Sequence, residues 1–165
     1  MLQVVQDLRN GATRAIDVPQ PALRPGHVLI RTRASLISSG TERMLVEFGR
    51  SDLLHKALAQ PQRVKQALDK ARTDCIVSTL QAVRDKLDTP LPLGYCNVGE
   101  VIGLADGVRG FRLGDLVASN GAHAEVVCVP ATLCARVPEK VAIEAAAFAV
   151  PGAIALQGIR LAAPT

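Results

Sequence analysis

The stretch between residues 99 and 117 constrains the fold more than any other part of this chain. Glycines recur there every three or four residues, with Val, Ile and Leu between them: Gly99, Gly103, Gly107, Gly110 and Gly114. Glycine weakens a helix, and in sheets it marks bulges, tight turns and close approaches of two backbones. The stretch therefore predicts short strands joined by turns, as in a small barrel.

Other segments also have strand character. The dipeptide Asn10-Gly11 separates two short apolar runs and predicts a hairpin. Residues 28–34 alternate, which predicts a strand with one buried side. Its two faces are Val28, Ile30, Thr32 and Ala34 against Leu29, Arg31 and Arg33. Shorter strands are expected at 91–94, 124–129 and 133–137.

Residues 42–88 follow a helical pattern instead. Apolar stripes at spacings of three and four predict amphipathic helices that cover their own domain or bind a partner. The stripes are Val64, Leu68 and Ala71, and then Ile76, Leu80, Val83 and Leu87. Residues 143–161 predict a last helix, interrupted at Pro151-Gly152. The fold class expected from these patterns is mainly β with helices (α+β).

Composition excludes several classes of protein. A chain of 165 residues that is 48% hydrophobic can bury the core of one domain. With 2% aromatic residues, no Trp and a net charge of +4, it lacks the stacking platforms and concentrated basic face typical of nucleic-acid binding. The apolar stretch 145–163 contains Pro151, Gln157 and Arg160, so a buried helix is expected rather than a membrane span.

The cysteines and the N-terminal residues bear on location and metal binding. No two cysteines form a Cys-x-x-Cys pair, and no histidine lies at zinc-finger spacing from any of them: Cys75, Cys96, Cys128 and Cys134. The first residues lack the pattern of a secretion signal. We therefore expect a cytoplasmic protein with buried or half-buried thiols, without nucleic-acid or membrane partners.

Four segments, in the same order along the chain, resemble the GroES-like domain of the medium-chain dehydrogenases/reductases: 28–38, 99–117, 122–130 and 144–148. The resemblance implies a GroES-like, partly open β-barrel over residues 1–143, with a helical insert at 42–88. Residues 144–165 would be a helix that leads to a Rossmann domain. The parent protein would be an oxidoreductase that uses NAD or NADP on an alcohol or carbonyl group.

The nucleotide-binding half of such an enzyme is not found in this sequence. No Gly-x-Gly-x-x-Gly lies between a strand and a helix pattern, as dinucleotide binding requires. The chain is therefore expected to be a fragment that is inactive alone and binds no NAD or NADP tightly. Its expected partners are the missing nucleotide-binding domain and a small-molecule substrate.

Departures from the family pattern concern the metal. Where zinc alcohol dehydrogenases have a Cys and a His as zinc ligands, the resemblance places Ser38 and Tyr95, and Cys96 replaces the Glu that follows the His. Neutral hydroxyls are poor zinc ligands, so no zinc is expected. Residues 34–43, the insert and residues 90–95 further resemble a zinc-free branch linked to polysaccharide biosynthesis. Members of that branch are often fused to a domain of the glucose–fructose oxidoreductase type.

The resemblance also suggests roles for individual residues. Tyr95 is the candidate proton donor, with Ser38 beside the substrate; packing of Tyr95 as a half-buried side chain is the alternative. Ser39, Gly40 and Thr41 are candidates for contact with the nicotinamide ribose or the substrate, or for the start of a helix. Glu42 and Arg43 would orient a sugar hydroxyl or a phosphate, or form a surface pair. The histidines at 27, 55 and 123 are expected to be structural or exposed to solvent.

Two other functions stay open at this point. The insert and an open barrel edge would also suit a non-enzymatic binding or assembly domain, including association of identical copies into a homo-oligomer. Weak binding of nucleic acid through the basic insert is a third hypothesis, which predicts a steep dependence of affinity on salt.

Overall fold

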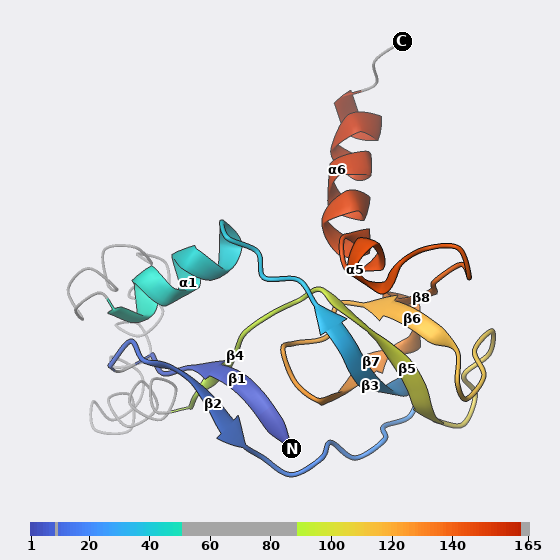
Figure 1. The fold of residues 1–165 in the computed structure, drawn as a ribbon, viewed down its shortest axis with the longest axis horizontal. Helices are drawn as coiled ribbons and strands as arrows, with labels where there is room; N and C mark the ends of the chain where they lie inside the picture. The colour runs from blue at the N-terminus through green and yellow to red at the C-terminus, as the bar shows by residue number, and fades with distance from the viewer. Residues whose placement is uncertain (9, 51–88, 163–165) are drawn as a thin grey trace, which may run out of the picture. The chain divides into compact units, whose positions relative to one another are not determined.

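The computed structural model describes residues 1–8, 10–50 and 89–162 (Figure 1). The chain divides into two compact units. The first unit comprises Met1–Val4, Ala15–Ser38 and Pro92–Thr165, and the second comprises Val5–Arg14 and Ser39–Leu91. We expect a boundary at residue 143 between a GroES-like domain and a linking helix. The two compact units do not test that boundary, so it stays a prediction.

A five-stranded sheet dominates the first unit. Its order is β7-β3-β5-β6-β8, and all neighbouring strands are antiparallel. The strands are β3 (His27–Ser35), β5 (Asn97–Leu104), β6 (Leu116–Ser119), β7 (Val126–Pro130) and β8 (Cys134–Arg136). The glycine-rich stretch forms β5, a connecting loop and the start of β6, as its pattern predicts. A short 3-10 turn at Ala131–Leu133 separates β7 from β8.

One glycine explains how closely β3 and β5 approach each other. A Cβ atom on Gly99 would collide with the carbonyl oxygen of Arg31 in the neighbouring strand. The β3–β5 register also shifts twice, once between Leu29 and Ile30 and again between Thr32 and Ala34. Such shifts bend and twist a sheet. The predicted bulges are therefore confirmed, and the close approach of the two backbones at Gly99 is a further finding.

The core of this unit consists of aliphatic side chains from four of the five strands. Its fully or nearly fully buried members include Val28, Ile30, Val101, Val117 and Val129. With so few aromatic residues in the sequence, burial of branched aliphatic groups supplies most of the hydrophobic stabilisation. These core residues lie in segments that the sequence predicts to be strands.

The prediction that β3 buries only one side is wrong at the start of the strand. Leu29 is buried together with Val28 and Ile30, whereas Arg31 and Arg33 are exposed as expected. The loop before β3 approaches the same part of the sheet, because Leu23 and Leu29 both lie within 4 Å of the position that a Cβ atom on Gly103 would take. Alternation within one strand carries no information about such a neighbouring segment.

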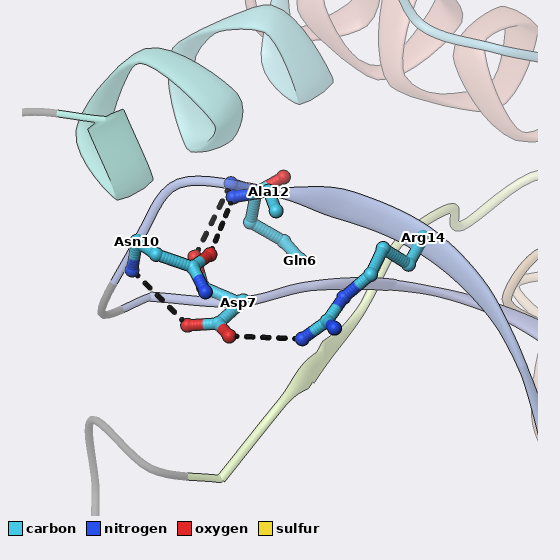
Figure 2. A network of polar contacts seen from close by, with 5 residues as sticks. All are labelled: Gln6, Asp7, Asn10, Ala12 and Arg14. Carbon is cyan, nitrogen blue, oxygen red and sulfur yellow. Dashed lines mark hydrogen bonds and ion pairs between the residues drawn. The ribbon is translucent and has the colours of Figure 1, made fainter.

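A second sheet contains the predicted hairpin. Its order is β2-β1-β4. The strands are β1 (Leu2–Gln6), β2 (Thr13–Asp17) and β4 (Leu91–Pro92). Figure 2 shows the polar contacts of the turn: the Asp7 carboxylate accepts a hydrogen bond from the Asn10 backbone at 3.2 Å and pairs with Arg14 at 3.1 Å. Asn and Asp side chains of this kind fix turns by bonding nearby backbone groups.

The start of the predicted insert is helical. Helix α1 (Thr41–Arg50) carries an ion pair between Arg43 and Glu47 at 2.7 Å. Glu42 is buried, so the expectation that Glu42 and Arg43 form a surface pair is wrong. The two apolar stripes predicted at 64–71 and 76–87 lie outside the described residues.

The C-terminal helical segment differs from its prediction in two ways. Helix α5 (Ile143–Ala146) ends before Ala147, and α6 (Ala149–Ala162) contains Pro151 in its first turn, where a missing N–H costs no helical bond. The break therefore precedes the expected Pro151-Gly152. Helix α6 also has no buried residue, so the expected buried helix is wrong. Within the described residues, no helix is long and apolar enough to cross a membrane.

Candidate functional site

The structure brings together Ser38 and Tyr95, the two residues that the family resemblance matches to zinc ligands. The hydroxyl of Tyr95 donates a hydrogen bond to Oγ of Ser38 at 2.9 Å, and the contact is partly buried. The two residues are 57 positions apart in the sequence. Two neutral hydroxyls bonded to each other can donate and accept hydrogen bonds, but they do not form a metal-binding donor set.

Antiparallel pairing explains why these residues meet. Ser35, at the end of β3, lies opposite Asn97 at the start of β5. The chain then continues alongside: the backbone N–H of Leu36 donates to the carbonyl oxygen of Cys96 at 3.0 Å. Ser38 and Tyr95 therefore extend from adjacent strand ends, on segments that the sheet holds side by side.

A glycine directly before Tyr95 is required by its surroundings. Gly94 has a φ of 94°, and a Cβ atom there would lie 2.7 Å from Cγ, Cδ2 and the backbone nitrogen of His123. That backbone nitrogen also donates to the carbonyl oxygen of Leu93 at 2.8 Å. The turn that presents Tyr95 is thus packed tightly against His123.

His123 is a further residue of this site, and no sequence pattern indicated its contacts. Its side chain is almost fully buried, and Nδ1 lies 2.8 Å from Oγ of Ser35. The sequence led us to expect an isolated histidine, structural or exposed to solvent. No local pattern could have revealed the contact, because Ser35 and His123 are 88 positions apart.

A second polar group lies one residue beyond Cys96. The amide Nδ2 of Asn97 donates to Oγ1 of Thr32 at 2.8 Å, and that hydroxyl donates to the carbonyl oxygen of Ala124. Oδ1 of Asn97 is buried and has no hydrogen-bond partner among the described residues. Buried polar groups of this kind are costly and uncommon. No sequence pattern indicated a polar role for Asn97 or Thr32.

The proposed cofactor-contacting residues belong to the second unit. Helix α1 begins at Thr41, and the carbonyl oxygen of Gly40 accepts a hydrogen bond from Met44 at 3.1 Å. Ser39 precedes them. The start of a helix is therefore observed here, while contact of Ser39, Gly40 and Thr41 with a nicotinamide or substrate stays a prediction.

The described cysteines offer little to a metal. Among residues 1–8, 10–50 and 89–162, no group of three His, Cys, Asp or Glu side chains could hold a metal ion. Cys96 is buried and Cys128 and Cys134 are partly buried, all three as free thiols. Burial raises the pKa of the Cys134 thiol to about 11, so it remains protonated at neutral pH. Cys75 lies outside the described residues.

The glycine-rich connection between β5 and β6 does not have the arrangement of a dinucleotide-binding loop. The glycines with positive φ in the β5–β6 connection lie between two strands rather than between a strand and a helix: Gly107, Gly110 and Gly114. A dinucleotide fingerprint places its glycines at the start of a helix, whose N–H groups bind the pyrophosphate.

Comparisons by sequence give limited information. No family model matches the chain. Molybdenum import ATP-binding proteins ModC of Brucella suis and Brucella melitensis are 34% identical over 111 residues, which is 67% of this chain but 30% of theirs. The chain thus spans less than a third of those relatives. It has no glycine followed by lysine, so it lacks the phosphate-binding loop Gly-x-x-x-x-Gly-Lys-Ser/Thr.

Comparisons by structure agree with one another. The quinone oxidoreductase of Coxiella burnetii superposes with a TM-score of 0.67 at 22% identity, over 98% of this chain and 44% of that chain. A mycobacterial protein complexed with NADPH gives 0.65 at 23% identity, covering 100% and 42%. Galactitol-1-phosphate dehydrogenase of Escherichia coli gives 0.65 at 18% identity, covering 98% and 45%.

These structures establish the fold class. The chain shares the GroES-like fold found in medium-chain dehydrogenases/reductases, and it spans less than half the length of each of the three chains. The predicted fold class is therefore confirmed, as strands in two sheets with helices. Within the described residues the strands form two open sheets and no closed barrel.

Proposed function

We propose that this chain is the substrate-side domain of a zinc-independent, NAD(P)-dependent oxidoreductase that acts on an alcohol or carbonyl group. The observation that carries the proposal is the hydrogen bond of 2.9 Å between Tyr95 and Ser38. Support for the reaction class comes from the fold, which is shared with a quinone oxidoreductase and a sugar-phosphate dehydrogenase. The substrate would be a small molecule, and a sugar derivative is the specific candidate.

The hydroxyl pair suits the proton transfer of such a reaction. When a carbonyl group is reduced, its oxygen gains negative charge and needs a proton; when bound, the nicotinamide supplies the hydride. A serine hydroxyl that accepts a hydrogen bond from a phenol still carries its own hydrogen. Ser38 would donate to the substrate oxygen, and Tyr95 would donate to Ser38 in turn.

The same pair is the reason to propose zinc independence. Zinc in proteins is held by thiolate, imidazole or carboxylate groups at about 2.0 to 2.3 Å. At the two positions in question the chain has a serine and a tyrosine, whose hydroxyls already bond each other. Proton donation by side chains would therefore replace polarisation by a metal ion.

The nucleotide would be held mainly by a domain beyond the described residues. Ser39, Gly40 and Thr41 would line its nicotinamide end, because small hydroxyl-bearing residues permit close approach of a ribose. Residues 1–143 would form the substrate-side domain, residues 144–165 would connect it to the nucleotide-binding domain, and the enzyme would work in the cytoplasm.

Helix α6 is the surface that we expect the nucleotide-binding domain to cover. Its apolar side chains are largely exposed: Ile154, Leu156, Ile159 and Leu161. A helix with several exposed apolar side chains is a candidate binding site for another protein surface. The same observation supports the alternative function, in which the chain is a non-enzymatic assembly domain and α6 binds a second copy or another protein.

The test uses the complete gene product that contains this chain. We would measure oxidation of NADH and NADPH with a panel of aldehydes, ketones and keto sugars, with and without a zinc chelator. Tyr95→Phe and Ser38→Ala should each lower kcat/KM by about 10²-fold or more, as expected for loss of a general acid. Phe148→Tyr, an exposed change outside the pair, is the control.

Three results would contradict the proposal. Loss of activity with the chelator, restored by zinc, would show a metal enzyme. Full activity of both hydroxyl variants would remove the pair from the mechanism. Absence of any nucleotide-dependent turnover, together with a stable complex formed through α6, would favour the assembly domain.

A further inference from the structure

We infer that His123 is a positioning residue that sets the geometry of the Tyr95–Ser38 pair. The functional importance of this role rests on the proposed function, but the geometric link can be tested without it. His123 contacts both segments that carry the pair: the end of β3, which leads to Ser38, and the turn that leads to Tyr95.

The first contact is with the turn before Tyr95. The imidazole lies so close to Gly94 that a Cβ atom at that position would be 2.7 Å from two ring carbons. The backbone of His123 also donates to Leu93 at 2.8 Å, so ring and backbone together hold the turn. The φ of 94° at Gly94 directs the following residue, Tyr95, and this conformation is available to glycine without strain.

The second contact is with the end of β3. Nδ1 of His123 lies 2.8 Å from Oγ of Ser35, the last residue of the strand. Only two residues, Leu36 and Ile37, separate Ser35 from Ser38. A displacement of Ser35 would therefore be passed along a short segment to the hydroxyl that accepts the bond from Tyr95.

Burial distinguishes this role from simple packing. His123 is 8% exposed, and a buried imidazole loses hydration that an aliphatic side chain of similar volume would not lose. A histidine is suited to such a position when its ring nitrogens form directed hydrogen bonds. The observed bond to Ser35 is of that type, whereas a merely space-filling residue would need none.

The sequence supplies a selective probe of this geometry. The chain has one tyrosine and no tryptophan, so its tyrosine fluorescence and the tyrosine signal in near-UV circular dichroism come from Tyr95 alone. Both signals respond to the hydrogen bond and the packing of the phenol. They report on the pair whether or not substrate or nucleotide is bound.

The experiment compares four variants by these two signals, with Ser38→Ala as a fifth that breaks the pair directly. His123→Leu keeps a similar volume without a hydrogen bond, and Ser35→Ala removes the other partner. His123→Asn can place an amide close to the position of Nδ1 and should restore the bond. Val129→Ala, in the same sheet, is the control for general loss of stability, because Val129 belongs to the core rather than to the site.

We expect His123→Leu and Ser35→Ala to change the Tyr95 signals in the same direction as Ser38→Ala. His123→Asn should recover most of the signal, and Val129→Ala should leave it unchanged in the folded protein. In the complete enzyme, His123→Leu should lower kcat by up to about 10²-fold with little change in KM, as misplaced catalytic groups do. Should His123→Leu fail to fold, Ser35→Ala tests the same link.

The inference would be overturned if Ser35→Ala and His123→Leu leave the Tyr95 signals unchanged. An equal change in Val129→Ala, or no recovery in His123→Asn, would also reduce His123 to a packing residue. These results are distinct from a failure of the proposed function: full activity of Tyr95→Phe would refute catalysis by the pair, while the spectra would still decide whether His123 positions it.

Discussion

The five-stranded sheet and helix α6 are built from the same kinds of residue, but they bury them differently. In the sheet, Ile30 and Val117 are fully buried. In α6, Ile159 is 58% exposed and Leu161 is 76% exposed, and Figure 1 shows the helix as a single element that projects beyond the strands. Strands that pair through their backbones lie side by side and bury one another's side chains. A single helix satisfies its own backbone hydrogen bonds and buries its side chains only where another element packs against it.

The two regions therefore contribute differently to the protein. Burial in the sheet stabilises the fold and holds the strand ends from which Ser38 and Tyr95 extend. Exposure in α6 leaves apolar side chains in contact with water, which is unfavourable and adds no stability to the fold. Matched substitutions in the two regions test this difference.

The largest expected difference comes from shortening one isoleucine in each region. Ile30→Ala should reduce the free energy of unfolding by about 2 to 5 kcal/mol, because it leaves a cavity in a closely packed core. Ile159→Ala should change it by less than about 0.5 kcal/mol, as for other exposed positions. Urea denaturation followed by far-UV circular dichroism would measure both. Equal losses would mean that α6 is packed in solution.

The next difference concerns glycine. Gly99→Ala should destabilise the protein by about 1 to 3 kcal/mol, because the new Cβ collides with the backbone of Arg31. Gly158→Ala, in α6, meets no atom within 4 Å and should stabilise the helix by about 1 kcal/mol. Thermal unfolding of the two variants should thus shift in opposite directions. A shift of the same sign in both would contradict the close approach of β3 and β5.

The smallest expected effect tests how well the edge of the sheet excludes water. The pKa of Cys134 rises from the reference value of 9.0 to about 11 on burial. The folded state then binds this proton more tightly than the unfolded state, so the stabilisation is present below about pH 9 and is lost as pH rises towards about 11. The free energy of unfolding should fall over that range less in Cys134→Ala than in the unmodified protein. Identical pH profiles would mean that the thiol is solvated.

Several elements could be predicted from the sequence because their causes are local. The Asn10-Gly11 turn and the strand at 27–35 follow from turn chemistry and side-chain alternation. Glycines between branched residues identified the region of β5 and β6. The meeting of Ser38 and Tyr95 was anticipated only through resemblance to a family, since no local pattern relates two residues 57 positions apart.

Other features depended on contacts between distant segments. Leu29 is buried on the side of β3 that alternation predicts to be open, and the helix break falls at residues 147–148 while Pro151 lies in the first turn of α6. The link from His123 to Ser35 joins the segment before β7 to the end of β3, and the two residues are 88 positions apart in sequence. None of these features alters the spacing of apolar residues in its own segment, so the local sequence pattern does not reveal it.

Residue patterns alone account for most of the described strands and turns, and the sequence contains the two hydroxyl residues, Ser38 and Tyr95, that the family resemblance singles out. These properties depend on backbone preference and side-chain chemistry, which act over a few residues. Only the tertiary structure decided that His123 supports that pair and that α6 stays exposed. Both depend on which surfaces meet when the strands pair, and that outcome is set by packing across the whole sheet.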